Sequence, residues 1–169
     1  LTLVAREGAP LEGAEGLLYG PFGKPTLTDS ERLSFTTLAD DDGMTRWAML
    51  SGGAGSMAVI AQEGEPAPIP GGGTLGGRPI GSGRHSPNDA GDTLFTQDAE
   101  VGEFDLNGLW IVRSNQLEAV AVVLEPSSFG EYYISVGPFT GSVVGDGAVV
   151  FAARVAGGVS SSTDSAVFK

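Results

Sequence analysis

The sequence predicts an all-β protein built as a β-propeller-like array of three four-stranded units. The first observation is that Gly 27 and Pro 10 among 169 residues interrupt the chain too often for long helices. The second is that the apolar runs, such as LWIV and GAVVFAARV, are short and rich in β-branched and aromatic residues, which is typical of strands. A third observation, an internal repeat, indicates how the strands are grouped.

Three phrases return in the same order along the chain. The opening phrase LTLVAREGAP (1–10) returns as MAVIAQEGEP (57–66) and as LEAVAVVLEP (117–126). A second phrase ends in a shared phenylalanine and a third carries an aromatic residue. The aligned residues are Phe35, Phe95 and Phe151 in the second phrase, and Trp47, Trp110 and Phe168 in the third. We therefore expect a single domain with repeat units 1–56, 57–116 and 117–169.

Each unit is expected to hold about four antiparallel strands, as a propeller blade does. The opening phrase would be the first strand, the shared phenylalanine would end the third, and the aromatic phrase would form the fourth. Since propellers have roughly four to eight blades, further repeats or a second copy would have to complete a ring. A β-trefoil-like threefold closed body is the structural alternative.

The charge balance limits the possible partners. The net charge is −12, from 21 acidic and 9 basic residues, which argues against binding to nucleic acid or to an anionic membrane. No apolar run approaches the length of a membrane span, roughly 18 residues. Cysteine is absent, so disulfides and thiolate metal sites are excluded. The chain begins with Leu rather than Met, which predicts a processed or excised piece of a longer protein.

One segment carries a recognisable motif. In NDAGDTLF (88–95), Asn88, Gly91 and Phe95 fit the pattern Asn-x-x-Gly-x-x-x-Phe. With VAREGAP and GLW, this segment resembles the bacterial tandem-repeat proteins marked by that pattern, many of which are exported and carry C-terminal sorting anchors. The first unit keeps only Phe35 of the motif, and the third keeps Gly147 and Phe151. The resemblance implies an exported, surface-associated, propeller-like repeat protein of a bacterium.

The same motif has a structural interpretation from its residues. Asn bonds readily to its own backbone and Gly accepts a positive φ, so Asn88 and Gly91 are expected to form a tight turn. Phe95 would then enter the core on the following strand. Trp47 and Trp110 share one repeat position in the alignment, which favours a core role for both.

Residues that could carry chemistry are few. Asp40 and Asp42, in ADDDG, are weak calcium candidates, although Asp-Gly pairs are also strong signals for a hairpin turn. His85 is the only histidine, and we expect it in a surface loop. No motif for a catalytic residue or for another cofactor stands out.

The sequence therefore predicts a non-catalytic module at the cell surface or outside the cell. It would act as a binding or structural scaffold for an extracellular protein or carbohydrate, either alone or as a homo-oligomer. The alternative is a propeller-type glycoside hydrolase or lyase supported by calcium, with acidic residues in a central cleft.

Overall fold

The chain folds into antiparallel β-sheets. The computed structural model describes residues 3–53, 55–77, 85–123, 132–136, 141–144, 147–156 and 164–169. Within these ranges the chain forms strands and no helix, and every pairing between strands is antiparallel. The prediction of an all-β protein is therefore confirmed. Among the described residues, no helix offers the length and apolar character needed to cross a membrane.

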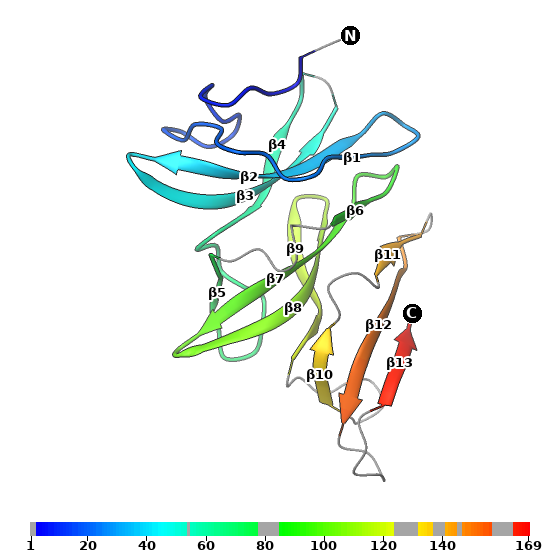
Figure 1. Cartoon of the computed structure of the whole chain (residues 1–169). Helices are drawn as coiled ribbons and strands as arrows, with labels where there is room; N and C mark the ends of the chain where they lie inside the picture. The colour runs from blue at the N-terminus through cyan, green and yellow to red at the C-terminus, as the bar shows by residue number, and fades with distance from the viewer. Residues whose placement is uncertain are drawn as a thin grey trace.

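The described strands group into three sheets, which follow one another along the chain (Figure 1). Sheet 1 has the strand order β1 (Thr26–Leu27), β2 (Leu33–Asp41), β3 (Met44–Gly52), β4 (Ala58–Gln62). In sheet 2, β7 (Thr93–Val101) is flanked on one side by β5 (Thr74–Leu75) and β6 (His85–Pro87), and on the other by β8 (Phe104–Arg113) and then β9 (Gln116–Val122). In sheet 3, β12 (Val149–Ala156) is flanked by β10 (Tyr132–Val136) and β11 (Ser142–Val143), and on the other side by β13 (Asp164–Phe168).

The sheets share one arrangement. Each has a first strand in two pieces, followed by two consecutive strands that pair with each other. In sheet 1 the bridges Leu18–Asp40 and Phe22–Thr37 replace the first piece. In sheets 1 and 2 a closing strand follows the hairpin.

The register of the three hairpins also agrees. The shared phenylalanine pairs with an apolar residue on the neighbouring strand in every sheet, as Phe35–Leu50, Phe95–Trp110 and Phe151–Phe168. The pairing with the closing strand shifts by one residue at corresponding places, between Met49 and Leu50 in sheet 1 and between Leu109 and Trp110 in sheet 2. These pairings identify which residues correspond from sheet to sheet.

The opening phrase has a different place from the one expected. Its second and third copies form β4 and β9, and each pairs with the strand before it, β3 or β8 (residues 124–126 of the third copy lie outside the described part). The expectation that the phrase begins a sheet is therefore wrong, because it ends one. Short links, 53–57 and 114–115, join these strands, so a local hairpin forms more readily than a pairing across a longer loop.

Two further expectations about the aromatic residues are corrected. The shared phenylalanine stands third in β2, β7 and β12, so it begins a strand rather than ending one. The register makes Leu50 the counterpart of Trp110, whereas Trp47 lies three residues earlier on β3. Trp47 and Trp110 are both fully buried, yet they fill different positions. An alignment on residue type alone could not reveal that offset.

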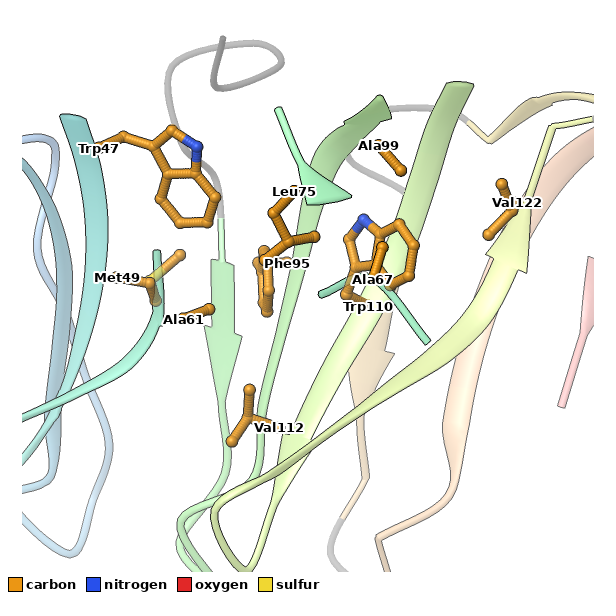
Figure 2. Close-up of a cluster of buried hydrophobic side chains, with 10 residues drawn as sticks. All are labelled: Trp47, Met49, Ala61, Ala67, Leu75, Phe95, Ala99, Trp110, Val112 and Val122. Carbon is orange, nitrogen blue, oxygen red and sulfur yellow. The ribbon is translucent and has the colours of Figure 1, made fainter. Parts of the chain in front are cut away.

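Two of the three apolar clusters of the described residues lie between neighbouring sheets. Figure 2 shows the cluster between sheets 1 and 2, where Trp47 and Met49 face Phe95 and Leu75. A second cluster joins sheets 2 and 3, and a third covers the outer face of sheet 1. Burial of such side chains contributes roughly 25 cal/mol per Å² of apolar surface, so contact between sheets is a main source of stability.

Hydrogen bonds reinforce the junction between sheets 1 and 2. The indole N–H of Trp47 donates across the junction to the carbonyl of Gly76, which also accepts a bond from the side-chain amide of Gln97. The indole N–H of Trp110 donates to the carbonyl of Gln97 at 2.8 Å. Both buried tryptophans therefore have partners for their only polar atom.

Candidate functional site

Three five-residue segments that share two backbone hydrogen bonds precede β2, β7 and β12, and residues 145 and 146 of the third lie outside the described part of the chain. They are residues 28–32, 88–92 and 144–148, and we call them the motif loops. In each, the N–H of the first residue donates to the carbonyl of the fifth, and the N–H of the fourth donates to the carbonyl of the first. The fourth residue has a positive φ in every copy: 60° at Glu31, 97° at Gly91 and 82° at Gly147.

The side chain of Asn88 closes the second motif loop. Its Oδ1 accepts the backbone N–H of Asp92 at 2.8 Å, and its Nδ2 donates to the carboxylate of Asp92 at 3.1 Å. In the first motif loop Thr28 makes the equivalent of the first of these bonds, because its Oγ1 accepts the backbone N–H of Arg32 at 3.2 Å. Phe95, at the end of the motif, is buried between sheets 1 and 2.

Successive motif loops touch one another. The backbone N–H of Ser30 donates to Asp89 at 3.1 Å, and hydrogen bonds from the side chain and backbone of Ser30 lower the pKa of Asp89. The guanidinium of Arg32 lies against Gly91, so closely that a Cβ there would stand 2.8 Å from Nη2. Between sheets 2 and 3, Arg113 donates to the carbonyl of Gly147. The motif loops therefore form a row that crosses the sheet junctions.

A polar pocket opens beside this row, between sheets 1 and 2. Its volume is about 250 Å³, and its lining contains a cation, a carboxylate and several hydroxyl or amide groups. The residues that supply these groups are Arg32, Asp92, Ser51, Ser56, Ser114 and Asn115. The Nε of Arg32 is buried and has no hydrogen-bond partner within the described part of the chain. A guanidinium with an unused donor suits a carboxylate, and the surrounding groups suit hydroxyls.

Reasoning from the sequence missed this pocket. Arg32, Asp92 and Ala148 are the fifth residues of the three motif loops, directly after the residue with positive φ. That position carries a cation, an anion and an apolar residue in turn. The different charges at this fifth position of the motif loops are the one signal in the sequence that could have pointed to the pocket.

The calcium candidates lie at the β2–β3 hairpin, Asp40 near the end of β2 and Asp42 in the turn. The carboxylate of Asp40 accepts the backbone N–H of Gly43 at 2.9 Å. Asp42 and Gly43 have φ values of 48° and 87°, the pair of left-handed residues that a type I′ turn between β2 and β3 requires. In the ranges that the structure describes, no group of three or more His, Cys, Asp and Glu side chains is placed to hold a metal ion.

His85 lies in β6 and not in a surface loop. It is half-buried, and its Nε2 stands 2.9 Å from the carbonyl oxygen of Ser34 in β2. The expectation of a loop histidine is therefore wrong. The physical reason is that the short strand carrying His85 pairs with β7 at the junction of two sheets, where the imidazole reaches a backbone acceptor.

These features define a class: an all-β protein of several antiparallel sheets, packed with apolar side chains between them and carrying a polar pocket at one junction. The chain belongs to the family described as a family of unknown function, DUF7453, whose model matches residues 1–169. Comparison with curated proteins and with solved structures gives no match.

Proposed function

We propose that this chain is an exported bacterial tandem-repeat module of propeller-like construction, which acts as a non-catalytic binding or structural scaffold at the cell surface. The likeness of Asn88, Gly91 and Phe95 to the repeat motif supports export and surface association. The order of strands supports the propeller-like part. In sheet 2 a broken first strand, a hairpin and a closing strand form an antiparallel meander, as in a propeller blade.

One observation carries the scaffold role: the residues that build the sheets correspond from copy to copy, while the polar residues do not. The phenylalanine that starts each hairpin and the positive φ of each motif loop recur. At the fifth position of the loops, Arg32, Asp92 and Ala148 differ in charge. These three residues are partly exposed, and a rigid frame with variable positions at its surface is how binding scaffolds present different surfaces.

The polar pocket is the binding site in this proposal. Its size and lining suit a small hydroxyl-rich group that carries a carboxylate, as in an acidic surface polysaccharide. Arg32 would supply the charged donor, and the hydroxyls of Ser51 and Ser56 would bond to the ligand's hydroxyls. Asp92 on the same wall would select against ligands with a second negative charge nearby.

Calorimetric titration with a uronic-acid oligosaccharide, and with a neutral oligosaccharide of equal length, tests this function. We expect binding of the acidic sugar and weaker or no binding of the neutral one. Arg32→Gln should weaken binding about tenfold or more, because a hydrogen bond to a charged group contributes about 1.5–3 kcal/mol. Arg46→Gln, an exposed change of equal charge on β3, is the control and should leave binding unchanged. No binding by the wild type, or equal binding by Arg32→Gln, would refute the pocket ligand.

A further inference from the structure

The two junctions between sheets place the motif loops against each other in the same way. In each junction the fifth residue of one motif loop lies against the fourth residue of the next. A Cβ added at Gly91 would stand 2.8 Å from Nη2 of Arg32. A Cβ added at Gly147 would stand 3.4 Å from Oδ2 of Asp92. Arg32 and Asp92 therefore hold corresponding places in the two junctions, with opposite charges.

At the junction between sheets 2 and 3, the charge of Asp92 has a partner within the protein. Arg113 is the last residue of β8, and its Nε lies 3.9 Å from Oδ2 of Asp92. Its Nη1 lies 3.9 Å from Oε2 of Glu118 in β9. The same guanidinium donates to the carbonyl of Gly147, so it links sheet 2 to the motif loop that precedes sheet 3.

At the junction between sheets 1 and 2, small residues replace that charged pair. Gly53 comes three residues after the partner of the shared phenylalanine in sheet 1, and Arg113 comes three residues after that partner in sheet 2. By the register of the closing strands, Ala58 of β4 is the counterpart of Glu118. Gly53 and Ala58 both line the polar pocket of about 250 Å³. The pocket therefore lies where the other junction carries an arginine and a glutamate.

The cation of this pocket lacks the counter-charge that its counterpart has. The Nε of Arg32 is buried and finds no hydrogen-bond acceptor among the described residues. The carboxylate on the same wall, that of Asp92, already accepts a hydrogen bond from Asn88 and pairs with Arg113. The space beside Gly53 thus adjoins a cation, as the corresponding space in the other junction adjoins an anion.

We propose that the ligand's carboxylate takes the place that Arg113 occupies in the other junction, with the charge reversed, and so bridges sheets 1 and 2. Arg32 binds it from the side of sheet 1, and the turn residues Ser114 and Asn115 bind it from the side of sheet 2. Gly53 is the specificity-determining residue, because a larger side chain there would occupy this space. The inference rests on the proposed function, to which it adds the position of the acidic group and the two sheets that this group joins.

A carboxylate built into the chain tests this position without a ligand. Gly53 has no left-handed φ, and a Cβ there would stand 3.4 Å from Oγ of Ser56, an ordinary contact, so the backbone accepts a side chain. Gly53→Glu supplies the carboxylate, and Gly53→Gln is the uncharged control of equal size. Gly53→Glu should unfold about 2–4 °C above Gly53→Gln. The difference should vanish when both variants also carry Arg32→Gln. A difference that persists without Arg32, or one that never appears, contradicts the proposal.

Calorimetric titration with the uronic-acid oligosaccharide separates this inference from the proposed function. The wild type should bind, and Gly53→Glu should bind at least tenfold more weakly, because its own carboxylate occupies the ligand's place. Met44→Glu adds the same charge at the opposite end of β3, at a site that is 60% exposed, and should bind like the wild type. Equal binding by Gly53→Glu and the wild type would overturn this inference alone. A wild type that does not bind would overturn the proposed function and, with it, the inference.

Discussion

The junction between sheets 1 and 2 and the outer face of sheet 1 are made of corresponding residues, yet one is closed and the other is open. Phe95 and Phe35 hold the same position in their hairpins. Phe95 is packed between two sheets, against Trp47 of the neighbouring sheet. Beside Phe35, by contrast, opens an apolar pocket of about 250 Å³, which Phe22 and Leu33 also line.

Phe35 is nevertheless only 4% exposed, because side chains of the segment before sheet 1, such as Leu11 and Tyr19, belong to its cluster. The corresponding position is therefore buried by a neighbouring sheet in one case and by the preceding chain segment in the other.

The largest loss of stability should come from truncating a side chain that is buried between sheets 1 and 2. Phe95→Ala should lower the free energy of unfolding by about 3–5 kcal/mol, because it leaves a cavity between two packed sheets. Phe22→Ala, at the open face where the ring is exposed, should cost about 1 kcal/mol or less. Urea unfolding of both variants measures the difference. Equal losses would mean that the outer face of sheet 1 is as closed as the junction.

A smaller effect should come from the motif loop at the junction. Gly91→Ala places a residue with a Cβ in the left-handed backbone conformation, which costs about 1–2 kcal/mol of folding free energy. The new Cβ also displaces the guanidinium of Arg32. Gly43→Ala carries the same backbone cost, but nothing lies within 4 Å of its new Cβ. Gly91→Ala should therefore be the more destabilising of the two in thermal unfolding. If Gly43→Ala costs as much, then the contact of Arg32 with the loop contributes nothing to the junction.

The smallest effect should appear only in acid. The pKa of Asp89 is lower in the folded protein than in the unfolded chain because Ser30 hydrogen-bonds to its carboxylate. A carboxyl group with a lowered pKa stabilises the fold above its unfolded pKa, about 4, and that contribution is lost as the pH falls toward the folded pKa. Asp89→Asn should therefore reduce the loss of stability below pH 4.

The matched control for the acid effect is Asp29→Asn, since Asp29 is the second residue of the first motif loop, as Asp89 is of the second. Unfolding measured as a function of pH for both variants makes the comparison. An Asp89→Asn variant with the same acid profile as the wild type would show that the contact with Ser30 does not link the two sheets in solution.

Local patterns predicted much of the fold. Short β-branched runs predicted strands, and Asp42-Gly43 predicted the hairpin turn between β2 and β3, because each depends on neighbours in sequence. The tandem repeat stays a prediction, supported by the common register of Phe35, Phe95 and Phe151.

Pairing between strands was harder to predict. The opening phrase could have begun one sheet or ended another, and only the hydrogen bonds of β4 and β9 decide between the two. Trp47 and Trp110 looked equivalent because tryptophan is rare, but their register differs by three residues. The polar pocket combines Arg32 with Ser114 and Asn115, which are far apart in sequence, so the change of charge at the fifth residue of the motif loops could point to Arg32 and Asp92 but not to the rest of the lining.

Strand β4 is hydrogen-bonded to sheet 1 although the chain then continues into sheet 2, and this decides where a shortened protein should end. A cut at residue 56, where the sequence phrases divide, would encode sheet 1 without its closing strand. The unpaired backbone groups along the edge of β3 would then promote aggregation during expression. A cut just after Gln62 would keep β4 hydrogen-bonded to β3, so the edge of β3 would stay covered.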